Sequence, residues 1–176
     1  MRFSEQMQLV LRAMQNAPVD VEGLALTLGL PVREAYLGDD TAGMLEKVSD
    51  GFFNKTPSGY QIVVNADQPE TRKRFTIAHE IGHFLYHRHL IGNGVGDSKA
   101  FRSTDKQRYF NTAIGPKQET EANQFAATVL MPKSLVARVA REEGLNSPAA
   151  LAKRFGVSEH AMCIHLGEPY EPRLSL

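Results

Sequence analysis

Apolar and polar positions follow two different periods along this chain, and the period changes after the first thirty or so residues and again near residue 69. In the first part, apolar residues recur at helical spacing, which predicts helices over residues 4–16 and 20–29. Asp20 suits the cap of the second helix, and Pro31 prevents its continuation. The chain is therefore expected to begin with a pair of helices.

The middle of the chain has shorter apolar runs, separated by clusters of glycine, proline, aspartate and serine. These runs predict three strands joined as a small meander: Val32–Leu37, Met44–Val48 and Gly59–Asn65. Beyond them the spacing is helical throughout. The expected helices cover residues 69–89, 117–130, 133–143, 147–155 and 158–166.

Strands followed only by helices predict an α+β fold, with a small antiparallel or mixed sheet over about residues 32–65. The connection over residues 91–117 is polar and carries five basic residues against two acidic ones. Connections of this length usually carry function or are mobile. We therefore expect a functional surface of the protein near this connection.

Composition narrows the class of protein. Of 176 residues, 20 are basic and 20 acidic, so electrostatic attraction to nucleic acid or to anionic lipid is not expected to be the main activity. The single cysteine, Cys163, excludes a disulfide framework, and we expect a small buried hydrophobe rather than a nucleophile. Polar residues interrupt the N-terminus, and no apolar run approaches the ~20 residues of a membrane helix, so the predicted location is the cytoplasm.

The most informative stretch is His79-Glu80-Ile81-Gly82-His83. Histidines four residues apart lie on one face of a helix, so both imidazoles can reach one metal ion. Glu80 would lie beside that ion, where it can accept a proton from water whose pKa the ion lowers. The flanking apolar residues predict a mostly buried helix, in which histidines need partners. We expect a catalytic metal centre.

Catalytic zinc sites usually have a third protein ligand, and two regions offer one. His87 and His89 follow the motif, but a straight helix cannot direct residues of three successive turns to one ion, so we expect them to cap or pack at the helix end. The next helix offers Glu119, with Asn123 one turn on to orient a ligand histidine. Glu121 points about 200° away on a helical wheel. Glu119 adjoins the buried stripe more closely and is the predicted ligand.

These residues resemble the ImmA/IrrE family of zinc-dependent metallopeptidases. The resemblance rests on RFTIAHEIGH (Arg74–His83), ETEANQFAATVLMP (Glu119–Pro132), LAKRFGVSEHAM (Leu151–Met162) and PVDVEGLALTLGLPV (Pro18–Val32). It spans about residues 19–166, and the two metal motifs with their spacing are its most specific part. It implies a zincin-like fold, in which the sheet packs on the metal-binding helix and the C-terminal helices have a helix-turn-helix-like arrangement.

The resemblance also implies roles for individual residues. His79, His83 and Glu119 would hold Zn²⁺, or Mn²⁺ or another divalent ion that the same donors accept, and Glu80 would be the catalytic base. The implied substrate is a helix-turn-helix (XRE-like) transcriptional repressor, often encoded nearby. Its cleavage would relieve repression of genes for stress response or mobile-element transfer.

Further residues have a chemical role open to them. Leu151–Ser158 has the helix–glycine–helix rhythm of a DNA-binding unit, but the helix after it has no arginine or lysine, so we expect packing beside the active site and no direct nucleic-acid contact. In that last helix, His160 and His165 are candidates for stabilising an oxyanion beside the metal. Tyr109, in the long connection, is a third candidate.

The strand before the metal helix is a candidate substrate-binding surface. As an edge strand, it could pair through Tyr60, Ile62 and Val64 with an extended substrate backbone. As a plain structural strand, it would only support the metal helix. The sequence pattern leaves both interpretations open.

Together these observations predict one metallo-endopeptidase domain over residues 1–176. It comprises N-terminal helices (1–31), a sheet with the metal-site helices (32–132) and a helical C-terminal subdomain (133–176). The alternative is a non-catalytic regulator that binds a repressor or antitoxin-like partner and whose metal site is structural or idle. Structural zinc sites are closed by four protein ligands, whereas catalytic sites keep one position open, so the ligand count distinguishes the two.

Overall fold

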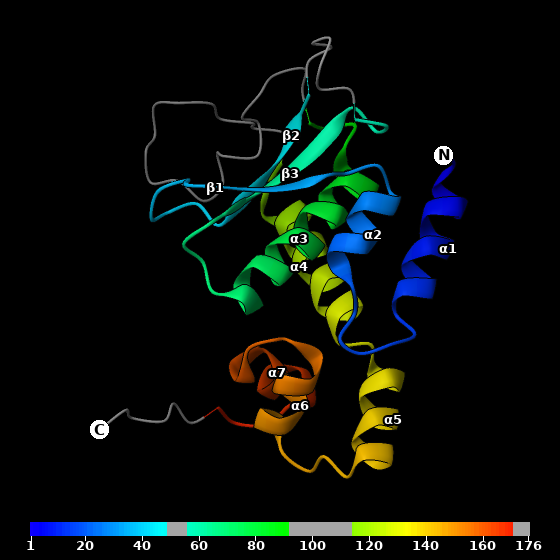
Figure 1. The fold of residues 1–176 in the computed structure, drawn as a ribbon, viewed down its shortest axis with the longest axis vertical. Helices are drawn as coiled ribbons and strands as arrows, with labels where there is room; N and C mark the ends of the chain where they lie inside the picture. The colour runs from blue at the N-terminus through cyan, green and yellow to red at the C-terminus, as the bar shows by residue number, and fades with distance from the viewer. Residues whose placement is uncertain (49–55, 92–113, 171–176) are drawn as a thin grey trace.

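The structure of the protein is a computed structural model, which describes residues 1–48, 56–91 and 114–170. A small sheet lies near one end of the molecule, long helices run through its middle, and shorter helices gather at the other end (Figure 1). The helices are α1 (Phe3–Ala13), α2 (Val21–Thr27), α3 (Glu70–Gly82), the π-helical η1 (His83–His87), α4 (Pro116–Leu130), α5 (Lys133–Glu143), α6 (Pro148–Phe155) and α7 (Glu159–Leu166). Each predicted helix is present within a few residues of its expected bounds, and the α+β class is confirmed.

Within the described residues, the sheet has three strands, β1 (Val32–Ala35), β2 (Gly43–Lys47) and β3 (Tyr60–Asn65), in the order β1-β3-β2. β3 pairs parallel with β1 and antiparallel with β2, and Ile62 is the partner of both Val32 and Leu45. The predicted meander is therefore wrong, although the expected mixed sheet is present. β3 takes the central place because its run of buried apolar residues suits a strand that is covered by neighbours, whereas β1 is polar and partly exposed.

The central place of β3 also decides between the two interpretations of this strand. Its backbone is paired on both sides, and Ile62 and Val64 are buried in the hydrophobic core. Tyr60 is partly buried and packs edge-on against Phe84, with ring centroids 5.7 Å apart. The interpretation of Tyr60, Ile62 and Val64 as an edge strand that pairs with substrate is wrong, and β3 supports the helix that carries the histidines.

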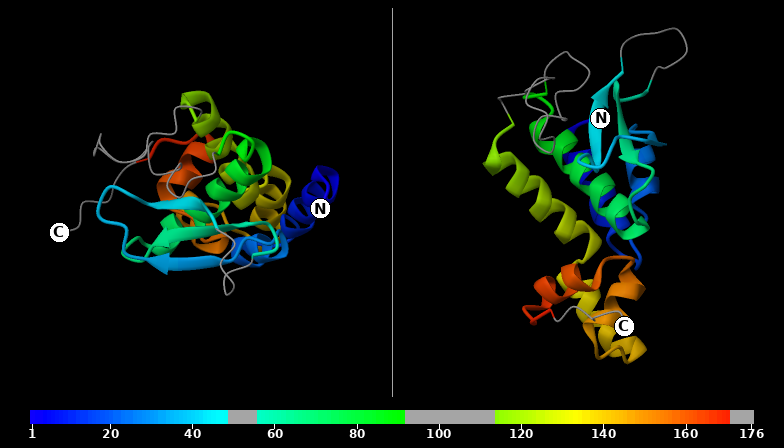
Figure 2. Two further views of the ribbon diagram at one scale, coloured as in Figure 1. Left: turned by 90° about the horizontal axis from the view of Figure 1, so that it is seen from above. Right: turned by 90° about the vertical axis from the view of Figure 1, so that its left-hand side faces the viewer.

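Helix α3 lies between the sheet and α4 (Figure 2). The two helices pack closely because α3 ends with Gly82, where an added Cβ would lie 3.1 Å from Phe125 Cδ1 and 3.3 Å from Ala122 Cα. No larger side chain fits there without moving α4. The glycine inside the histidine motif therefore sets the distance between the helices that carry the candidate site.

Arg74 of α3 links the C-terminal helices to the rest of the molecule. Arg74 donates hydrogen bonds to the carbonyl oxygen of Gly156, 3.1 Å away, and to that of Val19, 2.8 Å away. Gly156 ends α6 in the left-handed conformation (φ +64°), which a residue with a side chain adopts at a cost. Helices α6 and α7 then pack on each other after this turn. In the described part of the chain, no helix has the length and apolar character to cross a membrane.

Candidate metal site

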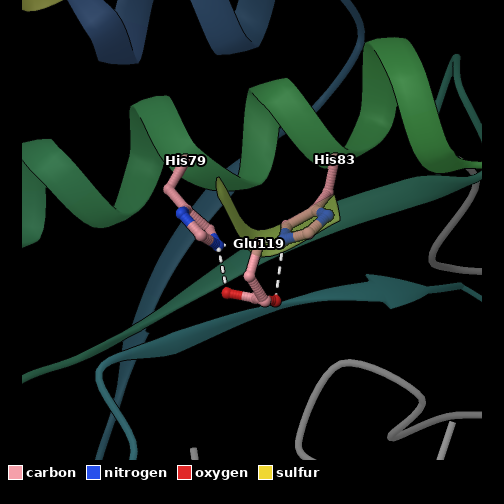
Figure 3. Close-up of side chains that lie close together, drawn as sticks. All are labelled: His79, His83 and Glu119. Carbon is pink, nitrogen blue, oxygen red and sulfur yellow. Dashed lines mark hydrogen bonds and ion pairs between the residues drawn. The ribbon is translucent and has the colours of Figure 1, made fainter. Parts of the chain in front are cut away.

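His79 of α3, His83 at the start of η1 and Glu119 of α4 converge in the interior of the molecule. His79 and His83 project from one face of the continuous helix formed by α3 and η1 toward Glu119 (Figure 3), and their Nε2 atoms lie 2.9 Å apart. The Glu119 carboxylate oxygens lie 3.4 Å from His79 Nε2 and 3.2 Å from His83 Nε2. One donor atom from each residue thus lies within 4.8 Å of the others, so the three can hold a metal ion.

Burial and charge both act on this cluster. His79 and His83 are buried, and the side chain of Glu119 is 20% exposed. Burial by itself raises the pKa of Glu119, but hydrogen bonds and charge attraction from the two histidines outweigh it, so that the pKa lies well below its usual range. Glu119 is therefore a carboxylate at neutral pH, which is the form that binds cations.

Asn123 lies one turn after Glu119 and contacts the far side of the first histidine. Its Oδ1 is 2.9 Å from His79 Nδ1. Because an amide oxygen only accepts, His79 donates from Nδ1, and its Nε2 keeps the lone pair that a metal ligand requires. The hydrogen bond expected from the spacing of residues 119 and 123 is present.

His87 has a more specific place than the expected cap of the helix end. It is buried in η1, with its Nδ1 3.1 Å from His83 Nδ1 and its Nε2 2.9 Å from Glu121 Oε2. Burial lowers the pKa of His87, and the hydrogen bond to Glu121 opposes this shift. Glu121 lies outside the metal cluster, as its helical phase predicts, yet it reaches the cluster indirectly. The four-residue spacing from His83 to His87 is the signal in the sequence for the contact between these two histidines.

Glu80 is almost completely buried, at 2% exposure. Within the described ranges, its Oε2 has no hydrogen-bond partner. A buried carboxylate oxygen without a partner is destabilising by a few kcal/mol unless water or a ligand supplies the missing hydrogen bond. The residue next to the first histidine thus has an acceptor atom available.

The donor set fits a divalent metal ion. Two imidazoles and one carboxylate are the protein ligands of one class of catalytic zinc site, in which a fourth position stays open. The same donors also accept manganese and other divalent ions. In the part of the chain that the structure describes, the cluster has three members, His79, His83 and Glu119. Three protein ligands leave one position of a tetrahedral ion to a further ligand.

The other candidate residues do not join this cluster. Cys163 is buried, and burial raises the pKa of its thiol, which makes it a poor nucleophile. His160 packs on Tyr170, with ring centroids 4.8 Å apart, and lines a separate pocket of about 210 Å³ beside the N-terminal half of α3. Burial lowers the pKa of His165, which is on α7 as well. Tyr109, with most of the 91–117 connection, lies outside the described residues.

Comparisons with known proteins agree with this candidate metal site. The family model described as IrrE N-terminal-like domain (Peptidase_M78) matches residues 39–166. The radiation response metalloprotease IrrE of Deinococcus radiodurans is 32% identical over 121 residues, which cover 68% of this chain and 34% of that protein. The solved structure of a Mycobacterium tuberculosis transcriptional regulator has a TM-score of 0.57 at 19% identity, covering 97% of this chain and 48% of the other, which is a likeness of fold alone. The chain thus spans about a third of the first relative and about half of the second.

Proposed function

Because the chain belongs to the Peptidase_M78 family of IrrE N-terminal-like domains, we propose that it is a metal-dependent endopeptidase. His79, His83 and Glu119 are the proposed ligands, with zinc the first choice of metal. The observation that carries the proposal is the convergence of these three groups from two helices around one point. A chance pair of histidines on a helix would not bring a carboxylate of another helix to both Nε2 atoms.

The remaining residues have roles that follow from their hydrogen bonds. The metal ion, when bound, polarises the scissile carbonyl and lowers the pKa of water. Glu80 accepts a proton from the attacking water at its unpartnered Oε2 and returns it to the leaving amine. Asn123 holds His79 in the tautomer whose Nε2 carries no proton. Burial of Glu80 and of both histidines excludes competing water and strengthens these interactions.

The proposed substrate is a helix-turn-helix transcriptional repressor in the cytoplasm, cut to relieve repression. Support comes from the family and from the name of one relative, a radiation response metalloprotease. Because the chain covers only part of each relative, the substrate and its place in the cell are proposed for this chain and are not taken from those proteins. The net charge of zero agrees with a protein substrate rather than direct binding to DNA.

The test is cleavage of a helix-turn-helix repressor, sought first among the products of the genes beside the one for this chain. Purified zinc-loaded protein is incubated with that repressor, and the products are identified by intact-mass spectrometry. We expect one main cut and no cut by Glu80→Gln at equal zinc content, because the amide keeps the shape of the side chain but cannot accept the proton. A stable complex without cleavage by the wild type would instead support the non-catalytic regulator.

A further inference from the structure

A chain of hydrogen bonds leads from the candidate metal cluster to the surface of α4. It runs from His83 Nδ1 to His87 Nδ1 over 3.1 Å, and from His87 Nε2 to Glu121 Oε2 over 2.9 Å. His87 is 3% exposed, whereas the side chain of Glu121 is 42% exposed. The middle member lies in η1, and π-helical turns inside α-helices are frequent at functional sites.

The direction of these hydrogen bonds follows from the chemistry of the end member. A carboxylate only accepts, so His87 donates from Nε2. A neutral imidazole has a single N–H, so His87 Nδ1 accepts, and His83 must donate from its own Nδ1. His83 Nε2 then has a free lone pair, and this atom is the one that lies 3.2 Å from the Glu119 carboxylate.

The opposite arrangement is unfavourable. If His87 donated from Nδ1, its Nε2 lone pair would face the Glu121 oxygen at 2.9 Å, and two acceptors at that distance repel each other. His83 would then have its proton on Nε2, where it blocks metal binding. The arrangement in which His83 donates from Nδ1 directs its Nε2 lone pair toward His79 Nε2, 2.9 Å away, and toward the Glu119 carboxylate, 3.2 Å away, and a metal ion removes the repulsion among these three groups. With a metal ion bound, Glu121 therefore supports, through His87, the tautomer of His83 that binds it.

We propose that His87 and Glu121 are a positioning pair that fixes the tautomer and the ring orientation of His83 for metal binding. The inference rests on the proposed function, since it assigns a task to residues outside the ligand set of that site. Helix α4 then orients both histidines. Its Asn123 contacts His79 directly, and its Glu121 acts on His83 through His87. Outer partners of this kind typically contribute about 10–100-fold to metal affinity.

The surroundings of the pair allow a clean experiment. His87 and Glu121 line a pocket of about 610 Å³, together with Gln118, Gln124 and the exposed His89. A change at the partly exposed Glu121 therefore leaves the hydrophobic core intact. His89 lines the same pocket but belongs to neither hydrogen bond of the chain, which makes it the matched control.

The first measurement is zinc affinity, by competition with a chelator, for the full chain and its variants. We expect His87→Phe, which keeps a ring but removes the acceptor, and Glu121→Gln to bind zinc about 10–100-fold more weakly than the wild type. His89→Phe should stay within about twofold, since it changes no hydrogen bond to a proposed ligand. His87→Gln, which offers an amide oxygen as Asn123 does, should recover part of the loss. Thermal unfolding of the metal-free proteins checks that each variant is folded.

The second measurement reads the hydrogen bond itself. Nitrogen–proton NMR correlation of the imidazoles in the zinc-loaded protein should show the Nδ1 proton of His83 in its hydrogen bond to His87 in the wild type. Glu121→Gln should shift or broaden this signal, because the amide can donate to His87 Nε2, and His87 Nδ1 then no longer accepts. A purely structural role for Glu121 would leave this spectrum unchanged.

The outcomes separate this inference from the proposed function. Wild-type zinc affinity and an unchanged His83 Nδ1 signal in Glu121→Gln would overturn the positioning pair, even if His87→Phe fails to fold. In that case, loss of zinc by His79→Ala would still support the metal site. Wild-type zinc affinity in His79→Ala would overturn the metal site itself, and the positioning pair with it.

Discussion

Substituting Gly82 by alanine tests whether the close packing of α3 and α4 sets the geometry of the metal site. The added Cβ would lie 3.1 Å from Phe125 Cδ1 and 3.3 Å from Ala122 Cα, whereas carbon atoms in contact prefer about 3.5–4.0 Å. Phe125 can adjust its ring, but Ala122 Cα is backbone. The contact is therefore relieved only if α4 moves away by a few tenths of an ångström.

Two opposing effects determine the stability of Gly82→Ala. Alanine is favoured over glycine inside a helix by about 1 kcal/mol. Overpacking a buried contact usually costs about 1–3 kcal/mol, and the upper part of that range applies because one obstacle is backbone. We expect the free energy of unfolding of the metal-free protein to fall by about 1 kcal/mol, which lowers the midpoint of thermal unfolding by about 2–4 °C in a chain of this length.

The effect on the metal site should exceed the effect on stability. Glu119 lies one turn before Ala122 on α4, so a shift of α4 carries its carboxylate away from the two histidines. We expect zinc affinity, measured by chelator competition, to fall about tenfold, which corresponds to about 1.4 kcal/mol. The double variant with Phe125→Leu, which removes one of the two obstacles, should recover part of both losses. Unchanged zinc affinity in a folded Gly82→Ala protein would refute the reasoning.

Three further predictions address individual side chains. Glu80→Gln should keep its zinc and lose peptidase activity, and activity in a zinc-replete preparation would exclude Glu80 as the base. Glu119→Ala should lower metal content at least about tenfold more than Glu121→Ala, because removing a ligand costs more than removing an outer partner. Metal analysis of both proteins decides this, and the reverse order would mean that the helical phase of these two residues is misassigned. Arg74→Met should lower the free energy of unfolding by about 2–3 kcal/mol in urea denaturation, since it removes two charge-assisted hydrogen bonds to carbonyl groups, and an unchanged midpoint would show that they add no stability.

Local patterns in the sequence account for most of the fold. Helix bounds follow from apolar spacing and from caps such as Asp20, which accepts a hydrogen bond from the Gly23 backbone at 2.9 Å. Strand order is different, because it depends on which strand is buried on both faces. The continuous apolar run Ile62-Val63-Val64 contains this information, whereas a meander assumes that strands adjacent in sequence are adjacent in space.

Helical phase alone predicts the part of the candidate site in which each residue's face on its own helix decides the contact. Phase places His79 and His83 together and separates Glu119 from Glu121, and the three residues assigned to the cluster are those that converge. It could not reveal the contact between His87 and Glu121, because that contact needs the π-helical turn and the distance between two helices. An interaction between elements far apart in sequence has no periodic signature in either of them.

The hydrogen-bond chain from His83 to Glu121 has an evolutionary consequence. Residues joined in this way should change together among related proteins, because losing one member removes the reason for keeping the other. Relatives without a histidine at position 87 should therefore vary freely at position 121, while the pairing of positions 79 and 123 persists in both groups. An alignment of family members, divided by the residue at position 87, would reveal this covariation without any measurement on the protein itself.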